Sequence, residues 1–270
     1  LNNMNGAVAR NTGIKVSKGE YLTFLDDDDF FLEDRLSTLV NSLENEPEFD
    51  AAYSNVVFIR GNSIDNIYEL SEEGHLQKSL LLNQSLLGTG SNIFIRRGVV
   101  KNLVGFDESF NRYQDVEFMI RVLGKFKMKK IEEFLVVKDI TDSRFYPEFN
   151  SFRLAQNHFI QKFDYLIQEL SFKEYKDFIL AKRSELIYSS YISNDRKNVK
   201  IAYDLLKEDL PNISRREVLK IKLKAIKNSG NSNEIVEGIR KYIRNTRRRN
   251  LEKQLPKLLI ERINIRMDNL

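Results

Sequence analysis

The stretch YLTFLDDDD, residues 21–29, decides the fold of the first half of the chain. Its five aromatic, β-branched and aliphatic residues predict a short buried strand without a polar face. Four consecutive carboxylates follow, which repel one another and are costly to desolvate. In an extended chain, Asp26 and Asp28 point to one side and Asp27 and Asp29 to the other. Such oxygen ligands suit a divalent cation, whereas a solvated acidic turn is the ordinary alternative.

Two helices and a second strand surround this stretch in an order typical of α/β folds. The periodicity of residues 3–18 predicts a helix, with Arg10 at the edge of its apolar stripe and Asn11 within it. The Asn11 amide therefore needs a specific hydrogen-bond partner. Residues 33–43 predict a second helix, and residues 51–59 predict a strand. This alternation favours an α/β fold with a largely parallel sheet.

A flexible segment in the middle of this half supplies a further candidate site. Residues 61–84 are polar and predict a loop with a short helix near residues 76–82. The segment GTGS, residues 88–91, then leads to a predicted strand at residues 92–95. Glycine lets a ligand approach the backbone. We therefore treat Gly90 and Ser91 as candidate substrate-binding residues, with a plain turn as the alternative.

The helix predicted at residues 114–124 carries two carboxylates with different surroundings. At 100° per residue, Asp115 lies at the centre of the apolar stripe. Glu117 lies on the opposite face, four residues before Arg121, which predicts a surface ion pair. The alternative for Asp115 is a helix cap, because aspartate is favoured at helix starts. A short helix at residues 97–103 and a strand at residues 131–137 complete this half.

Composition separates an acidic half from a basic half. Residues 1–150 hold 17 Lys and Arg against 24 Asp and Glu, whereas residues 151–270 hold 26 against 15. The basic half predicts helices at 151–170, 173–193, 196–209, 214–228 and 232–266. The absence of cysteine excludes disulfides and cysteine metal sites. The two histidines stand far apart in the sequence, which disfavours a histidine-rich metal site or a histidine triad.

Several blocks together resemble a known family. The runs NGAVARNTGI (5–14), GEY (19–21) and FLDDDD (24–29), followed by GFDE (105–108) and QD (114–115), resemble the family 2 glycosyltransferases of the GT-A fold. The order and spacing of these blocks make the resemblance specific, and it covers about residues 1–145. Residues 151–270 carry no resemblance that we can name.

The resemblance implies roles for five residues. It implies that Arg10 and Asn11 lie beside the nucleotide and that Asp26 contacts its base or ribose. Asp28 then ligates the Mg²⁺ or Mn²⁺ ion that bridges the diphosphate, as the last acid of a DXD motif. Asp115 is implied as the catalytic base.

The resemblance also implies a function and partners. It implies an inverting, metal-dependent glycosyltransferase that moves a sugar from a nucleotide-sugar, most simply a UDP-sugar, to a hydroxyl of a glycan, a lipid-linked glycan or a protein. Bacterial surface polysaccharide or glycoconjugate synthesis is the implied setting. We expect a cytoplasmic protein that is peripheral at the inner face of the membrane.

We expect a GT-A domain at residues 1–148 and a basic helical domain at residues 149–270. The family begins with a strand and helix around the nucleotide base that do not precede Leu1 here, so we expect a truncated chain that binds sugar nucleotide weakly and is itself inactive. The basic helices suggest an anionic membrane surface or a second copy of the chain as partners. The alternative function is a basic helical module that binds an anionic membrane or nucleic acid beside a non-catalytic α/β domain. The scattered cations lack a recognition motif, so we expect no nucleic acid.

Overall fold

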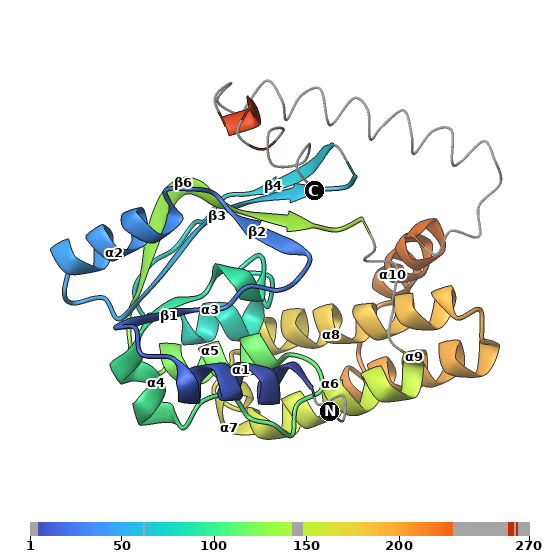
Figure 1. The fold of residues 1–270 in the computed structure, drawn as a ribbon. Coiled ribbons are helices and arrows are strands. Elements are labelled where there is room, and N and C mark those ends of the chain that lie inside the picture. Colours follow the sequence, from blue (N-terminus) through green and yellow to red (C-terminus); the bar gives the residue numbers. More distant parts are fainter. Residues whose placement is uncertain (1–4, 62, 142–147, 229–258, 262, 264–270) are drawn as a thin grey trace. The chain divides into compact units, whose positions relative to one another are not determined.

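The computed structural model describes residues 5–61, 63–141, 148–228, 259–261 and 263. The chain divides into two compact units, Leu1–Ser143 with Tyr242–Leu270, and Arg144–Lys241. The first unit contains the sheet, and the described part of the second is helical (Figure 1). The predicted domain boundary adjoins residues 142–147, which lie outside the described residues, so the predicted domain limits stay a prediction.

A six-stranded sheet has the order β1-β5-β3-β6-β2, with β4 paired to β3. The pair β3–β6 is parallel and the other four pairs are antiparallel. The predicted α/β class is confirmed, but the sheet is mixed rather than largely parallel. A parallel pair needs a long crossover, which the helix-containing segment between β3 and β6 supplies. The strands are β1 (Tyr21–Thr23), β2 (Asp29–Phe31), β3 (Ala51–Ile59), β4 (Ile64–Tyr68), β5 (Phe94–Arg96) and β6 (Met128–Asp139).

Helices cover both faces of this sheet. Figure 1 shows α2 on one face and α4 and α5 on the other. The predicted helix at residues 97–103 and strand at residues 51–59 have the observed bounds. Strand β4 was missed inside the segment that we predicted as a loop. The helices are α1 (Gly6–Val16), α2 (Arg35–Asn45), α3 (Gln77–Leu82), the 3₁₀ helix η1 (Gly90–Asn92), α4 (Arg97–Leu103) and α5 (Gln114–Leu123).

The core forms around β3, whose small residues allow close packing. Ala51 and Ala52 are fully buried. On one face, Leu39 and Leu43 of α2 pack with Ala52 and Phe94. A second cluster joins residues of β2, β3, β4 and β6 to Leu259 and Ile263 near the end of the chain. Full burial of a leucine contributes roughly 1.5–3 kcal/mol, so these contacts fix the sheet that carries the candidate site.

The second unit is a helical assembly in which α8 packs against α6, α9 and α10. A capping box between Ser171 and Glu174 begins α8, which satisfies two backbone donors that would otherwise lack partners. The predicted helix at 232–266 lies mostly outside the described residues. Among the described residues, no helix has the length and apolar character needed to cross a membrane. The helices are α6 (Phe149–Lys162), α7 (Asp164–Ile167), α8 (Phe172–Ile192), α9 (Arg196–Asp209) and α10 (Arg215–Asn228).

Candidate functional site

The acidic run forms a turn rather than a continuation of the strand. β1 ends at Thr23, and the backbone N–H of Asp29 donates to the carbonyl of Asp26 at 3.1 Å. Carboxylate oxygens of Asp26, Asp28 and Asp29 therefore all lie within 4.8 Å of one another. The prediction that Asp29 points away from Asp26 and Asp28 is wrong, because the alternation of side chains holds only for an extended chain.

Asp29 is the buried member of this cluster. Its side chain has 0% exposure, and its Oδ2 accepts from the Thr89 hydroxyl at 2.7 Å. Its Oδ1 lies 3.7 Å from the Lys138 ammonium and has no hydrogen-bond partner. Burial raises the pKa of Asp29, against the opposing effects of Ser91, Lys138 and Thr89. A buried carboxylate oxygen beside two other carboxylates is costly unless a cation joins them.

Arg10 of α1 connects the acidic run to α5. Its Nη2 lies 2.6 Å from Asp26 Oδ1, and its Nη1 donates to Gln114 Oε1 at 3.3 Å. Its guanidinium also lies over the Phe106 ring, 5.5 Å from the centroid. The structure thus brings the two predicted residues Arg10 and Asp26 into direct contact, although no sequence signal indicated this pair.

Asn11 holds the turn that follows α4. Its Nδ2 donates to the carbonyl of Phe106 at 2.9 Å and to the Glu108 carboxylate at 2.8 Å, and its Oδ1 accepts from the N–H of Phe106 at 2.8 Å. Gly105 has φ +78°, and a Cβ there would stand 2.5 Å from Asn11 Oδ1. The expected specific partner of Asn11 is therefore the GFDE turn. Its place beside a nucleotide stays a prediction.

The segment from Thr89 to Asn92 holds the acidic run from the other side. The N–H of Asp26 donates to Ser91 Oγ at 3.0 Å, and Thr89 donates to Asp29 as described above. Lys138 donates to the Thr89 hydroxyl at 3.2 Å. Thr89, Asp29 and Lys138 are site residues that sequence reasoning did not identify. Thr89 stands beside the selected Gly90, whereas nothing in the sequence distinguished Lys138.

Gly90 lets two side chains approach the backbone. A Cβ at Gly90 would stand 3.1 Å from Asp115 Oδ2 and 3.5 Å from Arg10 Nη2. Asp115 therefore lies near Arg10, which pairs with Asp26, and its role as catalytic base stays a prediction. In this structure the space opened by the glycine is taken by protein side chains, and contact of Gly90 or Ser91 with a substrate stays a prediction.

Arg35 is a buried cation beneath this segment. It has 0% exposure, and its Nη2 donates to the carbonyl of Ser91 at 3.1 Å. Its Nη1 donates to Ser54 Oγ at 3.3 Å and to Asn92 Oδ1 at 3.4 Å. Burial lowers the pKa of Arg35 to about 9. These acceptors are neutral, and no carboxylate of the described chain pairs with it. Arg35 thus places a positive charge behind the acidic run.

Asp115 is not the cap of its helix. The cap position of α5 is Tyr113, in a left-handed conformation with φ 63°, and no side chain caps this end. Asp115 lies within the first turn and is half-buried. The alternative reading of Asp115 as a cap is therefore wrong, and its carboxylate is available beside Gly90.

Glu117 and Arg121 form an ion pair, but a buried one. The Glu117 side chain has 0% exposure, and Arg121 donates to it from Nε at 2.6 Å and from Nη2 at 2.9 Å. Arg121 also donates to the carbonyls of Leu103 at 2.8 Å and Gly105 at 2.7 Å. The prediction of a surface pair assumed a single apolar stripe on this helix, which would leave the opposite face exposed. It is wrong because α5 is buried on nearly all sides.

A cavity of about 800 Å³ opens beside the acidic run. We call it the acidic-run cavity. Asp26, Asp27 and Asp28 line it together with Arg10 and Lys138, and its remaining lining is largely apolar. Asp115 is outside this lining but adjoins Arg10, which belongs to it. The cavity combines carboxylates that suit a metal with cations that suit a phosphate.

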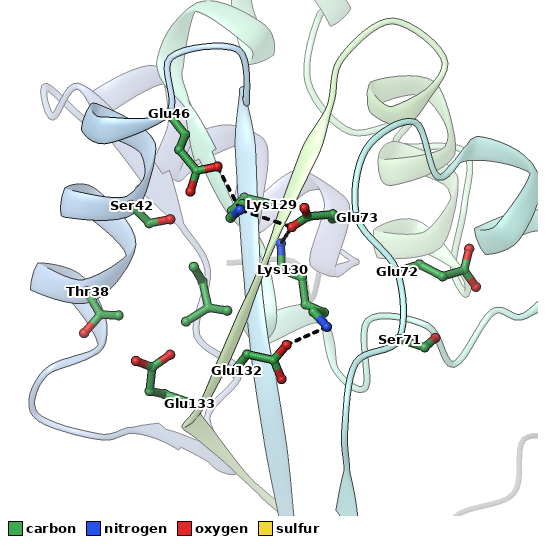
Figure 2. Close-up of a pocket in the computed structure, with 11 residues that line it drawn as sticks. Thr38, Ser42, Glu46, Ser71, Glu72, Glu73, Lys129, Lys130, Glu132 and Glu133 are labelled. Carbon is green, nitrogen blue, oxygen red and sulfur yellow. Dashed lines mark hydrogen bonds and ion pairs between the residues drawn. The ribbon is translucent and has the colours of Figure 1, made fainter.

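A second cavity, of about 610 Å³, is also rich in carboxylates (Figure 2). We call it the lysine-paired cavity, because Lys129 lies 2.8 Å from Glu46 and 3.3 Å from Glu73. In the same cavity, Lys130 lies 2.6 Å from Glu132. Internal cations thus pair with Glu46, Glu73 and Glu132 of this cavity, as the dashed lines in Figure 2 show. Across the part of the chain that the structure describes, the grouping of carboxylates that suits a metal is at the acidic run.

The acidic-run residues fit a hard divalent cation. Mg²⁺ and Mn²⁺ bind carboxylate oxygens, and here three carboxylates converge, one with a buried oxygen that lacks a hydrogen bond. Asp28, the implied ligand, is the exposed member. Asp29 joins it as a ligand candidate that the sequence did not suggest.

Residues 2–104 match a family model described as Glycosyl transferase family 2. An uncharacterized glycosyltransferase of Methanocaldococcus jannaschii is 29% identical over 137 residues, which cover 50% of this chain and 47% of that protein. The poly(ribitol-phosphate) beta-N-acetylglucosaminyltransferase TarP of Staphylococcus aureus is 31% identical over 149 residues, 53% of this chain and 45% of that protein. A crystal structure of S. aureus TarS aligns with a TM-score of 0.43 and 13% identity, over 76% of this chain and 70% of that chain. The chain spans about half the length of these two curated relatives.

Proposed function

We propose that this chain, whose residues 2–104 match the model of glycosyl transferase family 2, transfers a sugar from a nucleotide-sugar donor to a hydroxyl acceptor. A bacterial relative named as a poly(ribitol-phosphate) beta-N-acetylglucosaminyltransferase supports a role in bacterial surface glycan synthesis. We propose a UDP-sugar as the donor, as the family resemblance implies. The acceptor is then a hydroxyl of a glycan, a lipid-linked glycan or a protein.

The convergence of Asp26, Asp28 and Asp29 beside Arg10 is the observation that carries this proposal. A sugar nucleotide carries a diphosphate, whose negative charge must be neutralised by nearby cations. The acceptor must also reach the sugar carbon that is bonded to this diphosphate. Arg10 and Lys138 supply fixed cations to the cavity. A divalent cation held by Asp28 and Asp29 would neutralise the charge that develops on the leaving diphosphate.

We propose that the Asp115 carboxylate accepts the proton of the acceptor hydroxyl. In an inverting transfer, the acceptor oxygen bonds to the anomeric carbon as the bond from that carbon to the diphosphate oxygen breaks. The acceptor's proton passes to a carboxylate, which contributes typically 10²–10⁴-fold to the rate. Asp115 lies next to Gly90 and near Arg10, which lines the acidic-run cavity, and this position supports the proposed role.

A donor panel tests this function. The full-length protein is incubated with UDP-, GDP- and dTDP-sugars and Mg²⁺ or Mn²⁺, and release of the free nucleotide is measured with and without a glycan acceptor. We expect release from one donor, which excess chelator and Asp28→Ala abolish. Glu73→Gln, in the lysine-paired cavity, is the matched control and should retain activity. Full activity in chelator or in Asp28→Ala would contradict the proposal.

A further inference from the structure

Helix α10 has two apolar faces, and one of them is about half exposed. Ala225, with 1% exposure, lies on the face that packs towards α8. On another face, Leu219, Leu223 and Ile226 are 53%, 59% and 42% exposed. Their spacing of four and three residues places them in one stripe. An amphipathic helix that only covers a core needs the first face and gains nothing from the second.

Cations border this stripe on both sides. At 100° per residue, Arg216 and Lys220 lie along one edge, and Arg215 and Lys222 lie along the other. All four are exposed. Long basic side chains in this position extend their charged ends away from an apolar surface while their stems remain in contact with it.

The acidic residue of α10 does not cancel this charge. Glu217 lies 2.7 Å from the Lys176 ammonium of α8 and accepts from the Ser214 hydroxyl at 2.7 Å. It is thus held at the start of the helix on the packed side. The exposed stripe therefore presents aliphatic side chains between charges of one sign.

We propose that this stripe of α10 docks on an anionic lipid surface, with the helix axis lying in the plane of the surface. Apolar side chains between flanking Lys and Arg are the features by which helices bind such interfaces, and each cation near an anionic surface adds attraction. A second copy of the same stripe is a poorer partner, because it would bring two sets of cations together. Nucleic acid is a poorer partner because the centre of the stripe is aliphatic. The proposal concerns where the protein acts and does not depend on the proposed catalysis.

Co-sedimentation of the full chain with vesicles tests the proposal. One vesicle contains equal parts of phosphatidylglycerol and phosphatidylcholine, and the other contains phosphatidylcholine alone. We expect binding to the first, little to the second, and weaker binding as salt rises. The double variant Leu219→Ser with Leu223→Ser should lower the partition coefficient about tenfold or more, because two leucines no longer enter the interface. Lys220→Gln with Lys222→Gln should lower it about tenfold.

Leu154→Ser is the matched control, because Leu154 of α6 is 63% exposed in the same unit. It should bind vesicles as the unchanged protein does. Equal binding to both vesicles, no binding to either, or equal loss in Leu154→Ser would overturn the proposal. So would a large fall in melting temperature for the Leu219 and Leu223 variant, since this stripe would then be a packing surface. Binding of homopolymeric RNA that survives the leucine changes, without vesicle binding, would assign the basic face to nucleic acid instead.

Discussion

Two cavities on the same sheet unit are rich in carboxylates, yet they differ in what neutralises them. In the lysine-paired cavity, Lys129 contacts both Glu46 and Glu73, so one internal cation joins two carboxylates (Figure 2). Beside the acidic-run cavity, Arg10 contacts one oxygen of Asp26, and the carboxylates of Asp28 and Asp29 converge next to it, with the Lys138 ammonium 3.7 Å from Asp29.

The difference shows that the number of carboxylates does not define a site. The lysine-paired cavity holds glutamates on long side chains, and three of them lie within 3.3 Å of a lysine of β6. The acidic run holds short aspartates on a tight turn, so their oxygens converge. Like charges at this distance repel, and Lys138 lies 3.7 Å from Asp29 Oδ1, which accepts no hydrogen bond. We therefore propose that the acidic run binds a cation from outside the chain.

The largest effect should come from Asp115→Asn, which keeps the size of the side chain but cannot accept a proton. We expect turnover to fall by about 10²–10⁴-fold, while donor affinity changes little. Steady-state kinetics with the donor found in the panel would measure both. The matched control is Glu73→Gln, which removes a carboxylate from the paired cavity. Normal turnover in Asp115→Asn would show that the proton goes elsewhere.

Glu117→Gln sharpens the comparison, since Glu117 is paired like the glutamates of Figure 2 but fully buried. It leaves Arg121, which is 21% exposed, without its charge partner, although its hydrogen bonds to the carbonyls of Leu103 and Gly105 remain. We expect a loss of about 1–3 kcal/mol in the free energy of unfolding, measured by urea denaturation. Glu132 is exposed and pairs with Lys130. Glu132→Gln should therefore lower the free energy of unfolding by only roughly 0–1 kcal/mol. If the two variants lose equal stability, burial does not decide the strength of these pairs.

A smaller effect is expected from Lys129→Met, which is the most direct way to break the comparison. The pair is partly exposed, at 18% for Lys129 and 38% for Glu46, so the loss of stability should be about 1 kcal/mol or less. Glu46 and Glu73 would then lack their shared cation, and we expect weak Mn²⁺ binding to appear in this cavity. If calorimetry detects no Mn²⁺ binding in this variant, side-chain geometry rather than pairing with lysine explains why the two cavities differ in metal binding.

Much of the sheet unit could be predicted from the sequence. The run AAYSNVVFI is apolar and β-branched, and β3 has its predicted bounds at residues 51–59. The mixed apolar and polar residues of the segment IDNIY predict a loop. In the structure this segment forms β4, which pairs with β3. That pairing is a tertiary contact, which local composition does not show.

The candidate site could be predicted in part. The acidic run and Asp115 were found because an unusual residue type stands in an apolar pattern. Asp29 was misplaced because the prediction extended β1 into the run, where the chain turns. Nothing in the sequence marks Arg35 as part of the site, since its neutral partners Ser54, Ser91 and Asn92 come from distant segments.

The central claim is that the acidic run, and not the lysine-paired cavity, binds a divalent cation. Titration of the chain with Mn²⁺, followed by electron paramagnetic resonance of the free ion, measures this without donor or turnover. The account predicts one site per chain, lost in Asp28→Asn and in Asp29→Asn, and unchanged in the double variant Glu46→Gln with Glu73→Gln. A site that survives both aspartate variants, or that disappears with the two glutamates, would contradict it.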